Sequence, residues 1–238
     1  PKKRFLKLKD EIRVFNESYY NSQPQISDAD FDKLKFEYEN LLLNNPTLKK
    51  YDDIGVGSTP TSKFQKIKHI LPMLSLANSF SVNDLKDFFT KASNFLKSKE
   101  NKETYIVDCK IDGVSLSLTY KNKKLVTALT RGDGVIGENI TENIMGINDI
   151  PKSLIFCKSK IIEIRGEIFF SREDFKSLNI ELDDKKKFSN PRNAASGSLR
   201  QINSEITNKR PLQFIPHGYG YISDSNEFNT YQEFMEFC

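Results

Sequence analysis

The chain has 238 residues, of which 37% are hydrophobic and 29% charged, so it can build one large packed domain or two small ones. Eleven Gly and nine Pro exclude a collagen-like or low-complexity chain. The sequence has neither a run of 18 apolar residues nor a secretory signal, so we expect no membrane span or leader. Three widely spaced cysteines predict reduced thiols in a cytoplasmic protein. The net charge of +4 favours anionic partners without deciding between them.

Two amphipathic helices are predicted at the N-terminus. Residues 3–20 carry apolar side chains at three- and four-residue steps, and a second such run extends from Asp28 to a stop before Pro46. Pro24 breaks the chain between them. The sequence therefore predicts a helical hairpin, followed by a linker over residues 52–63.

The rest of the sequence predicts an α+β domain with largely antiparallel sheets. A helix is expected over 82–97, behind the N-cap candidate Ser81. From residue 104 the apolar period changes to two, which is typical of strands. The predicted strands are 104–112, 114–120, 125–130, 161–170 and 212–222, with short helices after Ser171 and over 191–199.

The segment YIVDCKIDG contains a candidate nucleophile, Lys110. In a strand, Asp108, Lys110 and Asp112 share one face. An amine must lose its proton before it attacks, and a partly buried cationic site can lower the pKa of a lysine enough for this. From KIDG alone, the alternative of a lysine paired with two aspartates at a strand end is favoured, because so short a motif recurs by chance.

A glycine-rich loop follows in TRGDGVIGE, and it begins with Arg131. Exposed amides in such a loop can approach a phosphate closely, and an arginine can grip that phosphate with its forked guanidinium. The alternative is a tight hairpin turn with a surface arginine.

The segment EIRGEIF places Glu163, Arg165 and Glu167 on one face of a predicted strand. This polar stripe suits a pocket lining, where Glu167 could bind a ribose hydroxyl or Mg²⁺. The alternative is a strand face that meets solvent.

The segment NPRNAASGSLRQ carries Arg192 and Arg200 on a short helix rich in small residues. Arginine, serine and free amides at a helix N-terminus suit phosphodiester contacts, and the alternative is a tightly packed helix. His69 and His217 lie far from each other and from any cysteine pair. We therefore expect them to serve in packing or on the surface rather than as metal ligands.

Taken in order, CKIDG, TRGDGVIGENITEN, IRGEIFF and FSNPRNAASGSLRQ resemble the adenylation domain of NAD-dependent DNA ligases. YYNSQPQISDADFDKL is similar to that family's nicotinamide-side module, and PMLSLANSF to its adenosine-pocket segment. The resemblance implies a helical NMN-binding module with its linker over 1–62. It further implies an ATP-grasp-like nucleotidyltransferase domain over 63–238 that stops before the family's last two lysine motifs.

The resemblance also implies a reaction. Lys110 attacks the α-phosphorus of NAD, nicotinamide mononucleotide (NMN) leaves, and AMP stays on the lysine until it passes to the 5′-phosphate of nicked double-stranded DNA. Asp112 supports the later steps, and the family's metal is Mg²⁺, for which we assign no ligand residue. The implied binding residues are Ser75, Leu76, Asp108, Arg131 and Glu167 for the AMP half, Tyr19, Tyr20, Asp28, Phe31 and Asp32 for the NMN half, and Arg192 and Arg200 for nick phosphates.

Four positions differ from the family's usual residues. Asp108 replaces Glu, Tyr20 replaces His, Phe31 replaces Tyr and Ala77 replaces Asp. These differences leave a second hypothesis, a catalytically impaired, ligase-derived protein that binds nucleotide or DNA. A third hypothesis is an ATP-using nucleotidyltransferase. The nicotinamide-side module speaks against it, because ATP contains no nicotinamide for that module to bind. The first hypothesis predicts a monomeric cytoplasmic ligase of DNA replication and repair that binds no membrane.

Overall fold

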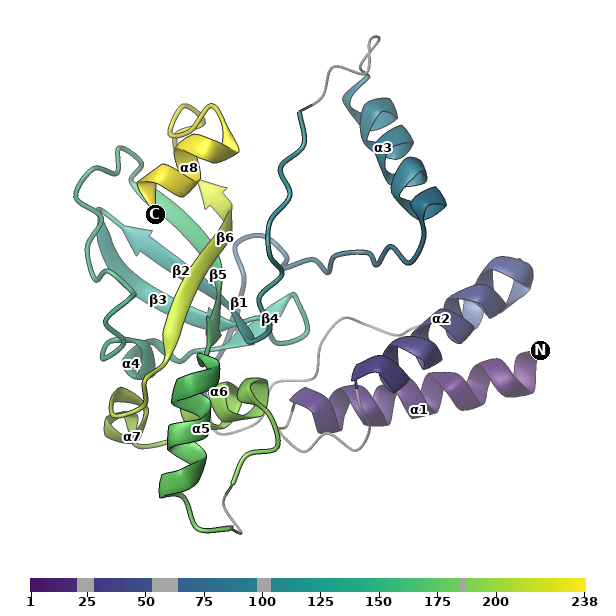
Figure 1. The fold of residues 1–238 in the computed structure, drawn as a ribbon. Helices are drawn as coiled ribbons and strands as arrows, with labels where there is room; N and C mark the ends of the chain where they lie inside the picture. The colour runs from purple at the N-terminus through teal and green to yellow at the C-terminus, as the bar shows by residue number, and fades with distance from the viewer. Residues whose placement is uncertain (21–27, 53–63, 98–103, 185–186) are drawn as a thin grey trace. The chain divides into compact units, whose positions relative to one another are not determined.

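The computed structural model describes residues 1–20, 28–52, 64–97, 104–184 and 187–238. The chain divides into two compact units (Figure 1). One unit, here the sheet unit, combines residues 1–73 with 112–238, and the second consists of residues 74–111. Among the described residues, none of the helices has the length and apolar character that crossing a membrane requires.

The N-terminal hairpin has a small core of its own. Its elements are α1 (Lys2–Tyr20), α2 (Asp28–Asn44) and the 3₁₀-helix η1 (Pro46–Tyr51). The ring of Phe5 stacks on Tyr38 with centroids 4.6 Å apart, and the Tyr38 hydroxyl donates to Asp52 Oδ1 at 2.7 Å. Both predicted helices are confirmed. The predicted break at Pro24, and all of the predicted linker 52–63 except Asp52, lie outside the described residues.

An antiparallel four-stranded sheet forms the centre of the sheet unit, in the order β3-β2-β5-β6 (Figure 1). The strands are β2 (Val114–Lys121), β3 (Lys124–Thr130), β5 (Ile161–Phe169) and β6 (Gln213–Ile222). Asn122 and Lys123 form the β2–β3 turn with φ values of 48° and 69°, a left-handed conformation typical of two-residue hairpin turns. The predicted hairpin and the two later strands are confirmed.

The strand predicted over 104–112 is wrong, because the sheet begins only at Val114. Residues 104–111 belong to the second unit, in whose described residues no strand forms, and Val107 is 96% exposed. Asp108, Lys110 and Asp112 therefore do not share a strand face. At Gly113 the backbone meets β5 so closely that a Cβ would lie 2.1 Å from the carbonyl oxygen of Ile168.

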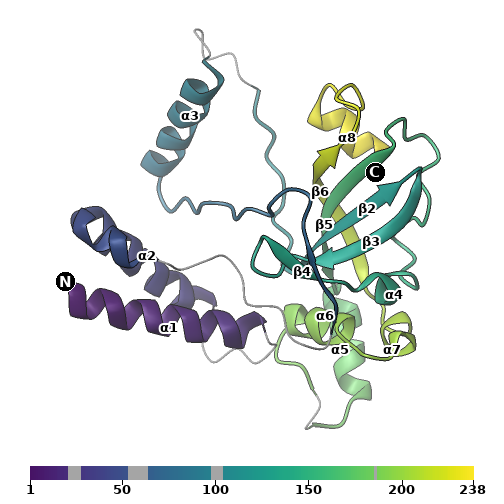
Figure 2. The same ribbon diagram turned by 180° about the vertical axis from the view of Figure 1, so that it is seen from behind.

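Shorter elements surround the sheet. β1 (Lys66–Lys68) and β4 (Ile136–Glu138) pair in an antiparallel ribbon beside β3 (Figure 2). The helices are α4 (Thr141–Ile144), α5 (Arg172–Glu181), α6 (Pro191–Leu199), α7 (Ser204–Asn208) and α8 (Tyr231–Phe237). The predicted α5 and α6 are confirmed. The other short elements were not predicted, since three to seven residues are too few to display a helical or strand period.

The second unit is built on α3 (Val82–Leu96), which confirms the predicted helix. Ser81 Oγ accepts from the Asp84 amide, and the Asp84 carboxylate accepts from the Ser81 amide, so the two form a capping box. The Phe89 ring lies 4.5 Å from the Tyr105 ring, which packs α3 against the chain that leads to Lys110.

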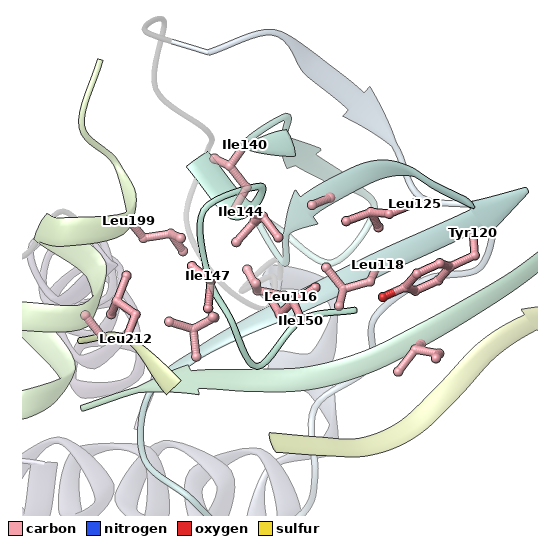
Figure 3. Packing of buried hydrophobic residues seen from close by; sticks show 14 of the residues in the cluster. Leu116, Leu118, Tyr120, Leu125, Ile140, Ile144, Ile147, Ile150, Leu199 and Leu212 are labelled. Carbon is pink, nitrogen blue, oxygen red and sulfur yellow. The ribbon is translucent and has the colours of Figure 1, made fainter. Parts of the chain in front are cut away.

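The apolar core of the sheet unit lies between β2 and the segment that follows β4 (Figure 3). Its buried side chains include Leu116, Leu118, Tyr120, Leu125, Ile140, Ile144, Ile147, Ile150, Leu199 and Leu212. Lys152 closes this segment, because its ammonium donates to the carbonyls of Ile144, Ile147 and Ile150 at 3.1, 2.7 and 2.6 Å. Burial lowers the pKa of Lys152.

Leu116→Ala tests this core. The Leu116 side chain is fully buried, so we expect the free energy of unfolding to fall by about 2–5 kcal/mol, since the substitution loses apolar burial and leaves a cavity. Val126→Ala, on the neighbouring strand and 46% exposed, is the control and should cost less than about 1 kcal/mol. Urea denaturation followed by circular dichroism measures both. Equal losses would contradict the burial pattern.

Candidate active site

A polar cluster lies where β2, β5, β6 and α6 meet. Arg192 Nη1 lies 2.9 Å from Asp112 Oδ1 and 4.0 Å from Glu167 Oε1. The Ser115 hydroxyl donates to Glu167 Oε2 at 2.7 Å, and His217 Nε2 lies 4.0 Å from the same oxygen. The Glu167 side chain is only 9% exposed, whereas that of Asp112 is 61% exposed. The cluster is therefore buried at Glu167 and open to solvent at Asp112.

Strand register explains why these groups meet. β2 and β5 pair so that Ser115 lies opposite Glu167 and Ser117 lies opposite Arg165, two residues from Glu163 on the same strand face. The two serine hydroxyls donate across the sheet to the two carboxylates, at 2.7 and 2.8 Å. Both glutamates are buried, so the interpretation of this strand face as solvent-facing is wrong. The sequence predicted the glutamates, but it missed the serines as their partners.

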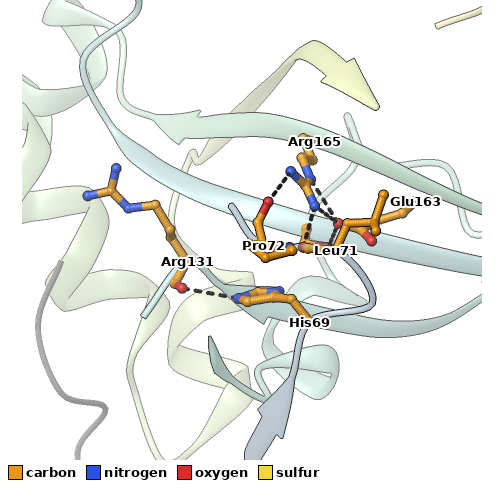
Figure 4. Close-up of polar contacts among 7 residues, drawn as sticks. His69, Leu71, Pro72, Arg131, Glu163 and Arg165 are labelled. Carbon is orange, nitrogen blue, oxygen red and sulfur yellow. Dashed lines mark hydrogen bonds and ion pairs between the residues drawn. The ribbon is translucent and has the colours of Figure 1, made fainter. Parts of the chain in front are cut away.

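A second polar cluster, around Glu163, lies nearer the start of β5 (Figure 4). Glu163 Oε1 accepts from Ser117 Oγ and from Arg165 Nε, each at 2.8 Å. The Arg165 guanidinium also donates to the carbonyls of Pro72 at 3.0 Å and Leu71 at 2.7 Å. Arg165 therefore connects β5 to the chain that follows β1.

The glycine-rich loop is a tight turn. The Gly134 amide donates to the Arg131 carbonyl at 3.0 Å, and the amides of Val135 and Ile136 donate to Asp133 Oδ1 at 2.9 and 2.7 Å. Gly134 has a φ of +90°, which other residues rarely adopt. Since these amides bond within the loop, the prediction that they are exposed for a phosphate is wrong. The predicted role of the Arg131 side chain stays a prediction.

His69 supports this loop from inside the protein. It is 4% exposed, and its Nε2 lies 3.0 Å from the Arg131 carbonyl, so Nε2 carries the proton (Figure 4). A Cβ at Gly137 would lie only 3.0 Å from the imidazole ring. Burial lowers the pKa of His69 below its ordinary value of 6.5, although the bond to Arg131 opposes the shift. The predicted packing role is confirmed.

Arg200 forms a largely buried ion pair at the end of α6. Its Nη2 lies 2.9 Å from Glu138 Oε1, and the two side chains are 18% and 3% exposed. Within the same helix Ala194 and Ala195 are fully buried, and a Cβ at Gly197 would lie 2.6 Å from the Phe188 ring. The interpretation of α6 as a tightly packed helix is confirmed. The predicted contact of Arg200 with a nick phosphate stays a prediction.

The remaining predicted site residues lie on other parts of the chain. Lys110, Asp108, Ser75 and Leu76 are exposed residues of the second unit, so their assembly with Arg131 and Glu167 into one cleft stays a prediction. Phe31 is half-buried and packs on the hairpin core. The structure describes only the helical backbone for the other four, which are Tyr19 and Tyr20 on α1 and Asp28 and Asp32 on α2.

Residues 61–238 match the family described as the NAD-dependent DNA ligase adenylation domain. This match covers more than half of the chain. The chain belongs to this family. Three residues from separate motifs of the ligase resemblance meet in the polar cluster. They are Asp112, Glu167 and Arg192.

Known relatives agree with this assignment. A DNA ligase of Pelagibacter ubique (strain HTCC1062) is 47% identical over 229 residues, which cover 93% of this chain and 33% of the relative. DNA ligases of Methylorubrum extorquens (strain PA1) and Dinoroseobacter shibae are each 41% identical, over 93% and 99% of this chain and 28% and 33% of the relatives. The chain thus spans about a third or less of the length of these ligases.

The buried His69 predicts a pH effect on stability. Because its pKa is lowered in the folded state, the unfolded chain binds more protons as pH falls below 6.5, and the free energy of unfolding should fall with it. We expect His69→Gln to weaken this dependence between pH 7 and 5. Urea denaturation at several pH values measures it. The exposed His217 provides the control, His217→Gln, and an equal effect of both variants would contradict the assignment to His69.

Arg200→Met should destabilise the protein by about 3–5 kcal/mol, because it removes the arginine from its ion pair with the buried Glu138 carboxylate. The double variant Arg200→Met with Glu138→Leu should recover most of that loss. Urea denaturation of both single variants and the double variant gives the coupling energy. If the losses simply add, Arg200 does not serve as the partner of Glu138.

Proposed function

We propose that this chain forms the adenylation centre of an NAD-dependent DNA ligase, with Lys110 as its nucleophile. The observation that carries the proposal is the convergence of Asp112, Glu167 and Arg192 in one cluster, within a chain that belongs to the ligase adenylation family. Asp112 lies two residues after Lys110, so the KIDG motif leads directly into this cluster.

The reaction proceeds in three steps. The Lys110 amine bonds to the α-phosphorus of NAD as the phosphorus–oxygen bond to NMN breaks, and the amine proton passes to solvent. AMP then moves from the lysine to the 5′-phosphate of nicked double-stranded DNA, and the 3′-hydroxyl of the nick displaces it. Transfers of this kind depend on charge neutralisation and positioning, which Arg131 and Arg192 supply.

The carboxylates of the cluster suit Mg²⁺. Mg²⁺ prefers one or two protein carboxylates together with substrate phosphates and water. Asp112 and Glu167 offer such oxygens, and within the described ranges no group of three or more acidic, histidine or cysteine side chains forms a complete protein cage. Asp112 and Glu167 would hold the ion, which would neutralise charge on the transferring phosphate.

The N-terminal hairpin would provide the nicotinamide side of the site. Tyr19, Tyr20, Asp28, Phe31 and Asp32 lie on its two helices, and the resemblance assigns them to the NMN half of NAD. The family match begins at residue 61, close to the expected boundary between a module over 1–62 and an ATP-grasp-like domain over 63–238. We further propose that the protein acts as a cytoplasmic monomer.

The adduct on Lys110 provides the test. We expect the full-length protein that contains this sequence to gain one AMP on Lys110 when incubated with NAD and Mg²⁺, as measured by peptide mass spectrometry. Lys110→Ala should abolish the gain, because no nucleophile remains. ATP in place of NAD is the control and should give no adduct.

Two other results would contradict the proposal. An adduct with ATP but not with NAD would favour an ATP-using nucleotidyltransferase. Absence of any adduct, with DNA binding that weakens with salt and survives Lys110→Ala, would favour a ligase-derived binding protein.

A further inference from the structure

The chain leaves the sheet unit immediately after a set of main-chain anchors. The Arg165 guanidinium donates to the carbonyls of Leu71 and Pro72 (Figure 4). The Met73 amide donates to the Gly134 carbonyl at 2.8 Å. Met73 is 4% exposed, whereas Leu74 is 83% exposed and begins the second unit. The anchors therefore end where the segment containing Ser75 and Leu76 begins.

Glu163 fixes the orientation of the Arg165 fork. Its Oε1 accepts from Arg165 Nε at 2.8 Å and lies 2.7 Å from Nη2, so the carboxylate holds one edge of the guanidinium while Nη1 and Nη2 also donate to the carbonyls. The Glu163 and Arg165 side chains are 1% and 14% exposed. A Cβ at Gly220 would lie 2.6 Å from Glu163 Cδ and 2.8 Å from Arg165 Nε, so the neighbouring strand leaves little room for either side chain to move.

A stabilising role does not explain why Glu163 and Arg165 are buried together. Burying two charges costs about as much as their attraction returns, so a buried ion pair is weak evidence for a stabilising role. In the part of the chain that the structure describes, the second oxygen of Glu163, Oε2, is buried and has no hydrogen-bond partner, which adds to the cost. The Glu163–Arg165 pair does hold the carbonyls of Leu71 and Pro72 in place, just before the second unit begins.

We propose that Arg165 is a positioning residue for NAD binding, acting through the carbonyls of Leu71 and Pro72. By fixing these carbonyls, it fixes the point from which Ser75 and Leu76 extend. The inference rests on the proposed function, in which Ser75 and Leu76 contact the AMP half of NAD. A lysine offers one ammonium where arginine offers a fork, so Arg165→Lys should keep only part of the effect.

The test compares Arg165→Gln, Arg165→Lys and a control in the full-length protein. Lys152→Gln is the matched control, because Lys152 also donates to three main-chain carbonyls but holds a different segment. Hydrogen exchange of the Met73 amide reports the anchor. The rate of lysyl-AMP formation against NAD concentration reports the function.

We expect Arg165→Gln to speed exchange of the Met73 amide and to raise the KM for NAD by about tenfold or more, since small displacements of binding groups have large effects. The maximal rate should change by less than about threefold, because Arg165 touches no reacting atom in the proposed site. Arg165→Lys should fall between the wild type and Arg165→Gln. Lys152→Gln should leave both readouts unchanged, even where it lowers the free energy of unfolding.

Three results would contradict the positioning role of Arg165. Unchanged Met73 exchange in Arg165→Gln overturns the anchor, whatever the activity. Faster exchange with an unchanged KM for NAD overturns the positioning role and leaves the proposed function intact. A wild-type protein that forms no lysyl-AMP overturns the proposed function, and the role of Arg165 in it falls as well.

Discussion

Three buried glutamates, each with an arginine nearby, set the arrangement of the sheet unit. Glu163 pairs with Arg165, Glu138 with Arg200, and Arg192 lies 4.0 Å from Glu167. A carboxylate inside a protein is costly unless a cation and hydrogen bonds compensate it. This requirement brings the glycine-rich loop, the RGE strand and helix α6 together, and the cluster that we propose as the adenylation centre results from it.

The same requirement controls both ends of the segment that carries Lys110. Arg165 holds the carbonyls of Leu71 and Pro72 before the segment, and Arg192 holds the carboxylate of Asp112 after it. Both arginines, and the groups that they hold, belong to the sheet unit. If Lys110 is the nucleophile that we propose, such fixed ends would help to orient it, because orientation contributes much of the rate of group transfer.

How far the sequence predicted this structure depended on the length of each pattern. The alternation in 114–120 and 161–170 extends over a whole strand, and both strands are confirmed. The alternation before Gly113 looks similar, yet no strand forms there, because pairing partners lie far away in sequence and leave no local signal. The motifs singled out Asp112, Glu167 and Arg192, and the structure brings these three side chains together. They did not reveal Ser115 or His69, whose partners depend on strand register and on loop packing.

The glycine of KIDG has a consequence for how this motif can be transplanted. Gly113 lies so close to the Ile168 carbonyl that no side chain fits between the two segments. The chain can therefore enter β2 in this way only beside a strand placed as β5 is. Four residues grafted alone onto another protein would lack that partner. The smallest portable form of the motif is therefore a pair of strands, with the loop that carries Lys110 leading into one and Glu167 on the other.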